Sequence, residues 1–157
     1  MKKKSVLFVC LGNICRSPAA EAIFLDLINK KGLNDSFIVD SAGTGSWHIG
    51  KKADTRMIIA AQKRGVEILS RARQINTIDF KNFNYMVAMD DSNFENIIDL
   101  KSRQSISDFT SINKIQNFRS IFEETEVPDP YFGGDEGFDH VLDILEDSVS
   151  GFLDTVC

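Results

Sequence analysis

The chain has 157 residues, of which 43% are hydrophobic and 26% charged, and a formal net charge of -5. This length is typical of one domain, the apolar content excludes a disordered chain, and the negative charge argues against nonspecific nucleic-acid binding. Three cysteines are too few, and too odd in number, for a secreted disulfide scaffold.

The N-terminus joins a basic start to a short apolar run and so imitates a signal peptide. Gly12 and Asn13 interrupt that run, and Arg16 follows where a signal peptide would be uncharged. No stretch approaches the roughly 18 apolar residues of a transmembrane helix. The sequence therefore predicts a cytoplasmic protein, in which thiols stay reduced.

The first elements are expected to be a strand and a helix. Val6–Val9 is a short apolar run that ends at a Gly/Asn turn, which is typical of a buried parallel strand. Apolar residues then recur with the helical period over Ala20–Ile28. We expect Ser17 to be the N-cap of this helix and Pro18 its first residue.

A second strand and helix follow in the next part of the chain. Phe37–Val39 is expected to be a strand that runs into a loop at Ser41–Ser46. A helix is expected from about Asp54 to near Gly65.

The remaining elements continue the alternation. Tyr85–Met89 is predicted to be a strand, followed by a helix around Phe94–Ile98. Residues 101–127 are the least periodic part of the chain, where we expect one short strand and one short helix. The apolar pattern over Phe138–Leu153 predicts a long amphipathic helix. Residues 1–157 are therefore predicted to form one α/β domain, a parallel sheet with helices on both faces.

Ligands of such sheets bind beyond the carboxyl ends of the strands. These ends carry the segments Cys10–Ser17, Ser41–Trp47 and Asp90–Asn93, where we expect the site.

The segment Cys10–Ser17, the anion loop, connects the first strand to the first helix. Its backbone N–H groups can surround an anion at the positive end of that helix, and Gly12 and Asn13 tolerate the left-handed backbone of a tight loop. Arg16 adds a bidentate fork for phosphate, and the same surroundings favour the thiolate form of Cys10. The expected phosphate-binding residues are Leu11, Gly12, Asn13, Ile14, Cys15, Arg16 and Ser17. A thiolate at the base of an anion site suits attack on phosphorus, and Ser17 can stabilise the thiolate when it leaves.

An acid for the leaving group is expected at Asp129. Pro128 and Pro130 hold its backbone outside a helix, and Tyr131 and Phe132 can flank an aromatic substrate. The alternative for this segment by itself is an ordinary Pro-Asp-Pro turn.

Several segments together resemble the low-molecular-weight protein tyrosine phosphatases: Val9–Pro18, Asp40–Thr44, Ala72–Gln74, Met89–Asp90 and Asp129–Tyr131. The resemblance implies a four-stranded parallel sheet of the phosphotyrosine phosphatase I-like fold. It implies Cys10 as nucleophile, Arg16 as phosphate ligand and Asp129 as acid and then base. Ser41 and Asn13 would support the anion loop by hydrogen bonds.

The resemblance also implies the substrates and partners. Phosphotyrosine proteins and other aryl phosphates would be hydrolysed without a metal or cofactor, and phosphate, sulfate or vanadate would occupy the loop. Tyr131 would flank the substrate, and Trp47 would form a wall of the cleft, unless it is a half-buried core residue. No nucleic-acid or membrane partner is expected.

Two positions depart from the family pattern. Leu69–Arg71 stands where relatives often have a histidine that bonds the loop asparagine, so that support must differ. Phe132 replaces a second tyrosine. By resemblance, Cys15 could trap the oxidised Cys10 as a disulfide, although it could also be a small buried loop residue.

Two other functions stay open at this point. A thiol-dependent arsenate reductase shares this fold and loop, but it needs a relay of further cysteines, and Cys157 is the only other one. A non-catalytic phosphate-binding module should lack the nucleophile, the arginine or the acid, whereas all three are present. His48 and His140 are too isolated for a metal site and are interpreted as surface or structural residues.

Overall fold

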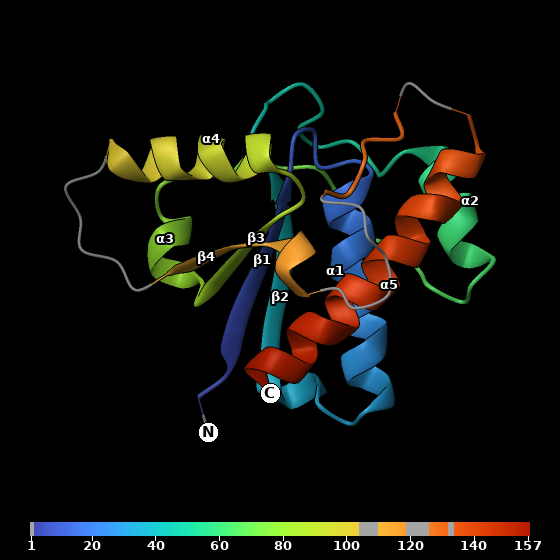
Figure 1. Cartoon of the computed structure of the whole chain (residues 1–157), viewed down its shortest axis with the longest axis horizontal. Coiled ribbons are helices and arrows are strands. Elements are labelled where there is room, and N and C mark those ends of the chain that lie inside the picture. The colour runs from blue at the N-terminus through green and yellow to red at the C-terminus, as the bar shows by residue number, and fades with distance from the viewer. Residues whose placement is uncertain (1, 104–109, 119–125, 132–133) are drawn as a thin grey trace.

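Four parallel strands form the centre of the computed structural model, which describes residues 2–103, 110–118, 126–131 and 134–157 (Figure 1). Their order in the sheet is β2-β1-β3-β4, and they are β1 (Lys4–Cys10), β2 (Phe37–Gly43), β3 (Tyr85–Ala88) and β4 (Ser111–Lys114). The predicted four-stranded parallel sheet is confirmed.

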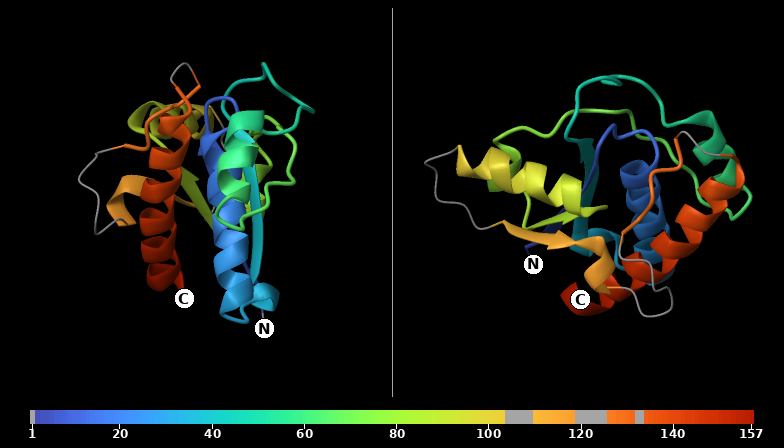
Figure 2. Two further views of the ribbon diagram at one scale, coloured as in Figure 1. Left: turned by 90° about the vertical axis from the view of Figure 1, so that its right-hand side faces the viewer. Right: turned by 45° about the horizontal axis from the view of Figure 1, so that its top comes forward.

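Helices cover both faces of the sheet, as predicted (Figures 1 and 2). The face that includes the C-terminal helix is covered by α1 (Arg16–Lys30), α2 (Thr55–Gln62) and α5 (Glu136–Val156). The other face is covered by α3 (Asp79–Asn82) and α4 (Asp91–Ser102). Two 3-10 turns complete the described elements, η1 (Asn34–Ser36) and η2 (Ile115–Phe118). No helix in the described part of the chain is long and apolar enough to cross a membrane.

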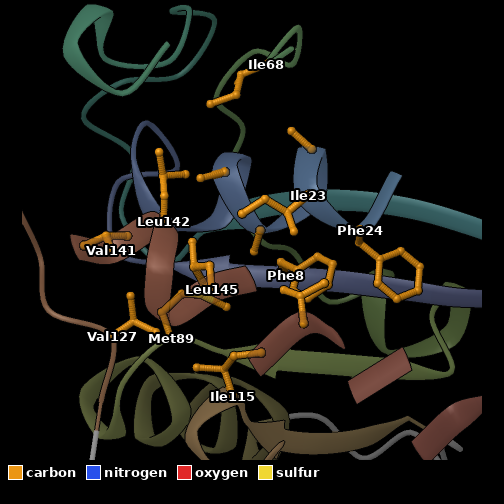
Figure 3. Close-up of a cluster of buried hydrophobic side chains, with 14 of the residues drawn as sticks. Phe8, Ile23, Phe24, Ile68, Met89, Ile115, Val127, Val141, Leu142 and Leu145 are labelled. Atoms are coloured by element: carbon orange, nitrogen blue, oxygen red, sulfur yellow. The ribbon is translucent and has the colours of Figure 1, made fainter. Parts of the chain in front are cut away.

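Alternate side chains of β1 enter two separate cores, because successive residues of a strand point to opposite faces. Phe8 packs beneath α1 and α5, where its ring lies 5.8 Å from that of Phe24 and 6.1 Å from that of Phe152, centroid to centroid (Figure 3). Leu7 and Val9 face α3 and α4 instead. The central strand is thus buried on both faces, which fixes the position of the loop that follows it.

Two expectations about the elements were wrong, and one element was missed. Helix α1 begins at Arg16 with Cys15 as N-cap, because the Ser17 hydroxyl bonds other groups and does not cap the helix. Strand β2 continues through Ser41 to Gly43, since these residues pair with β1 up to Cys10. The four-residue helix α3 was not predicted, because one turn is too short to show a period.

The strand order places the site. The sheet continues from β1 to β2 on one side and to β3 on the other, so the loops after β1 and β3 leave the same edge near its centre. Cys10 ends β1, and Asp90 follows β3 as the N-cap of α4. Both chain ends lie at the opposite edge of the sheet, at the bottom of Figure 1.

Candidate active site

The anion loop turns sharply at Asn13. Asn13 has a φ of 58°, in the left-handed region that asparagine tolerates better than most residues. Gly12 is not among the glycines with positive φ, so the loop needs only one of the two permissive residues. The turn directs the Asn13 backbone N–H to the Cys10 sulfur at 3.2 Å. The loop therefore already places one donor on the candidate nucleophile.

The Asn13 side chain holds the loop against two other segments. Its amide nitrogen donates to Ser17 Oγ at 2.7 Å and to Ser41 Oγ at 3.0 Å, and its oxygen accepts from the Arg73 backbone N–H at 3.0 Å. Ser41 lies on β2, so one buried amide joins the loop to the neighbouring strand and to the segment around Arg73. This side chain fixes the shape of the loop.

A hydrogen bond links the side chains of Ser17 and Cys10. The two side-chain atoms Cys10 Sγ and Ser17 Oγ are 3.0 Å apart. Because the Asn13 amide nitrogen can only donate, Ser17 Oγ accepts from it and keeps its own proton for another acceptor. Ser17 can therefore donate to the Cys10 sulfur and stabilise a thiolate there.

Arg16 is fixed beneath the loop and is only 2% exposed. Its Nη1 donates to Asp90 Oδ2 at 2.6 Å and to the Val127 carbonyl at 3.2 Å, while Nη2 lies 3.5 Å from Asp129 Oδ2. Burial opposes the charged form, but neighbouring Cys10, Asp90 and Asp129 outweigh it and raise the pKa of Arg16 above its usual value. A permanent, oriented positive charge therefore lies beside the thiol.

The acid loop, residues 127–131, brings Asp129 to the other side of this arginine. Pro130 is buried, and the Tyr131 backbone N–H donates to Asp129 Oδ1 at 3.1 Å. The carboxylate is 38% exposed, so it borders solvent as an acid for a leaving group must. Segments 119 residues apart in the sequence, at Cys10 and Asp129, thus meet at one site. Phe132 lies outside the described residues.

A cavity of about 220 Å³ opens above Cys10. Its walls are formed by residues from three segments: Cys10, Leu11, Gly12, Ile14, Cys15, Arg16, Trp47, His48, Asp129 and Tyr131. Trp47 is 67% exposed and lines the cavity, so it is not a half-buried core residue. The pocket combines apolar walls with a thiol and an arginine at its base.

His48 is a residue of this cavity that the sequence interpretation missed. Its ring packs so closely over Gly12 that a Cβ added there would lie 3.0 Å from His48 Cδ2, and its centroid is 6.1 Å from that of Tyr131. Its position next to Trp47 was the available signal. His140 is exposed on α5. In the described ranges, no three His, Cys, Asp or Glu side chains cluster in a way that could hold a metal ion.

The carboxyl group of Glu21 lies behind the loop, close to Ser70 of the segment Leu69–Arg71, where the resemblance led us to expect a different support. Ser41 Oγ donates to Glu21 Oε1 at 2.6 Å, so Glu21 continues the chain of hydrogen bonds that starts at Asn13. Burial raises the pKa of Glu21 above its usual value of 4.5, although bonds from Ser41 and Ser70 favour the charged form.

The three cysteines occupy different surroundings and are all free thiols. Burial, together with Asp54 and Cys10, raises the pKa of Cys15 strongly, so its thiol form is favoured. Cys157 is exposed and lines a separate hollow with Lys4 and Phe37, where β1 and β2 begin. The length of β1, about 20 Å for its seven residues, separates that end from Cys10.

Comparison with known proteins agrees with this geometry. Residues 5–157 match the sequence model of the family described as low molecular weight phosphotyrosine protein phosphatase. A Schizosaccharomyces pombe protein of that name is 42% identical over 156 residues, 99% of this chain and 98% of its own. The crystal structure of a protein tyrosine phosphatase from Entamoeba histolytica, with Hepes in its active site, superposes with a TM-score of 0.91 at 42% identity, covering 98% of this chain and 97% of that one. A Drosophila arginine phosphatase gives a TM-score of 0.91 at 34% identity, with 96% of each chain covered.

Proposed function

The chain belongs to the low molecular weight phosphotyrosine protein phosphatase family, and we propose that it hydrolyses phosphotyrosine and other aryl phosphates through a phosphocysteine intermediate, without a metal. The observation that carries the proposal is one cavity with Cys10 and Arg16 at its base and Asp129 at its edge. These side chains supply a nucleophile, a phosphate ligand and a proton donor.

In the first step the Cys10 thiolate attacks phosphorus and the ester P–O bond breaks. The leaving phenolate oxygen takes the proton of the Asp129 carboxyl group. Arg16 binds the phosphoryl oxygens through the edge of its guanidinium that faces Asp129, because Nη1 is held by Asp90 and Val127. Charge that develops on the phosphoryl group is thereby stabilised by a fixed cation and by the loop N–H groups.

In the second step water attacks the phosphocysteine and the S–P bond breaks. Asp129, now ionised, accepts the proton of the attacking water, and Cys10 leaves as a thiolate. Ser17 and the Asn13 backbone N–H donate to that sulfur, which makes it a better leaving group. The same two groups that prepare the nucleophile thus assist its release.

The walls of the cavity favour an aryl group. Leu11 and Ile14 line it, and the rings of Trp47, His48 and Tyr131 stand at its opening. A planar phenyl ring gains from such surroundings by apolar burial and stacking. A phosphoarginine substrate would instead place a charged guanidinium group against these largely apolar walls. We therefore favour phosphotyrosine over phosphoarginine as the substrate. Phosphoarginine is the alternative to compare, because one structural relative is a Drosophila arginine phosphatase.

The position of Cys157 argues against arsenate reduction. A thiol relay has to pass a disulfide outward from Cys10, whereas Cys157 lies at the other end of β1. The partners that we propose are phosphotyrosine-containing proteins of the cytoplasm, with phosphate, sulfate and vanadate as ligands of the anion loop.

The test measures hydrolysis of a phosphotyrosine peptide, a phosphoarginine peptide and 4-nitrophenyl phosphate in excess chelator. We expect no turnover by Cys10→Ser. In Asp129→Asn, we expect the turnover rate to fall by about 10²–10⁴-fold. Cys157→Ser is the matched control and should retain wild-type rates, because it changes an exposed thiol far from the site. Turnover by Cys10→Ser, a preference for phosphoarginine or a requirement for metal would contradict the proposal.

A further inference from the structure

An arginine outside the anion loop is bonded to the backbone of the acid loop. Arg56 stands in the first turn of α2, and its Nη2 donates to the Tyr131 carbonyl at 2.9 Å. Its guanidinium carbon lies 5.7 Å from the centroid of the Tyr131 ring and 4.6 Å from that of Phe138, a fully buried residue of α5. Arg56 thus ties the end of the acid loop to two helices.

The Tyr131 peptide that Arg56 holds also contacts the carboxylate of the acid. Its backbone N–H donates to Asp129 Oδ1 at 3.1 Å, and its carbonyl accepts from Arg56. A hydrogen bond from Arg56 therefore fixes the residue whose own N–H orients Asp129. The path of hydrogen bonds from the Arg56 guanidinium to the Asp129 carboxylate thus runs through one residue, Tyr131.

Asp54 connects the same arginine to the anion loop. Its carboxylate accepts from Arg56 Nε at 3.1 Å and from Nη2 at 2.9 Å, and it caps α2 by accepting from the Arg56 backbone N–H at 2.9 Å. Its own backbone N–H donates to the Ile14 carbonyl at 2.7 Å. Hydrogen bonds from Arg56 hold the pKa of the Asp54 carboxyl below its usual range, so the pair stays ionised near neutral pH.

We propose that Arg56 is a positioning residue, which together with Asp54 sets the acid loop relative to the anion loop and thereby places Asp129 over the leaving group. The inference rests on the proposed function, because it concerns the acid of that reaction. The guanidinium suits this task because its planar fork binds the Asp54 carboxylate and the Tyr131 carbonyl at once. The contacts of Arg56 described above reach Asp54 and the acid loop, so in this proposal Arg56 acts through the position of Asp129.

The test is a double-mutant cycle of Arg56→Ala and Asp129→Asn, with kcat/KM measured for two aryl phosphates. For phenyl phosphate, whose phenolate is a poor leaving group, we expect Arg56→Ala to lower kcat/KM by about 10–100-fold, which is the effect of displacing the acid by about 1 Å. For 4-nitrophenyl phosphate, which depends less on the acid, the loss should be under about threefold. In the Asp129→Asn background, Arg56→Ala should change either value by less than about twofold.

Arg64→Ala is the matched control. Arg64 follows the end of α2 and pairs with Asp139, Asp143 and Glu146 of α5, but it does not contact the acid loop. It should keep wild-type kcat/KM with both substrates. If Arg56→Ala does not fold, Arg56→Lys keeps the charge without the fork, and its losses should likewise vanish in the Asp129→Asn background.

The outcomes separate the two proposals. An inactive wild type would overturn the proposed function, and the role of Arg56 with it. An active wild type with additive losses in the cycle, or with equal losses for both leaving groups, would overturn the role of Arg56 alone.

Discussion

Replacement of Asn13 by alanine should lower the Tm of the chain strongly, because this one side chain supports the whole anion loop. The substitution removes two donated hydrogen bonds, to Ser17 and Ser41, and one accepted from Arg73. At about 1 kcal/mol for each, the loss is about 3 kcal/mol. Alanine at a φ of 58° adds about 1 kcal/mol of backbone strain.

The expected total of about 4 kcal/mol corresponds to a fall in Tm of about 8–16 °C for a chain of this length. Asn13→Gly separates the two contributions, because glycine loses the same hydrogen bonds without the strain. It should be more stable than Asn13→Ala by about 1 kcal/mol. Both can be measured by thermal and urea unfolding followed by circular dichroism.

Kinetics of the same variants show whether the support matters for the reaction. Without the Asn13 amide, the Ser17 hydroxyl is no longer held toward Cys10, so both variants should lose kcat even at temperatures where they are fully folded. A fall in Tm below about 3 °C, or an alanine variant as stable as the glycine variant, would refute this account of the loop.

Three further substitutions test neighbouring contacts. Ser17→Ala removes a hydrogen bond to a charged sulfur, so breakdown of the phosphoenzyme should slow by about 10–100-fold, measured as a larger burst followed by slower turnover. Asp90→Asn removes the ionic partner of buried Arg16, and the inhibition constant of inorganic phosphate should rise by about tenfold or more. Glu21→Gln tests pH dependence: burial raises the folded-state pKa of Glu21, so its charged form is less favoured in the folded than in the unfolded chain. Wild type should therefore lose stability relative to Glu21→Gln as pH rises above the usual value of 4.5, and a Tm difference that is constant with pH would contradict this.

The first strand, the anion loop and the first helix could be predicted from sequence because their signals are local. An apolar run, a permissive turn and a helical period lie within residues 6–28, and the structure places each there. The parallel direction of the strands followed from the alternation of strands and helices, whereas their order in the sheet could not be predicted from it. A role of Ser17 beside the thiolate was expected, but its bond with Asn13 could not be predicted locally, because Asn13 turns back to it only in the folded loop.

Two residues that join distant segments were missed, since His48 had only its position next to Trp47 as a sequence signal and Arg56 had none. His48 enters the cavity because the loop after β2 lies over Gly12, and Arg56 reaches the acid loop 75 positions away because α2 packs beside α5. Such contacts depend on how loops meet above the sheet, which neither spacing nor composition encodes. The end of β2 was mistaken for a loop because Asp40 and Ser41 are typical turn residues, whereas pairing with β1 satisfies their backbone groups.

Direct detection of the covalent intermediate tests the central claim best. Asp129→Asn is mixed with 4-nitrophenyl phosphate, whose leaving group departs readily, and quenched in acid before mass spectrometry of the digested chain. Because the base of the second step is missing, one phosphoryl group should accumulate on Cys10 and be absent from Cys15, Cys157 and the Cys10→Ser variant. Turnover without any phosphoryl group on Cys10, or with one on another residue, would contradict the mechanism.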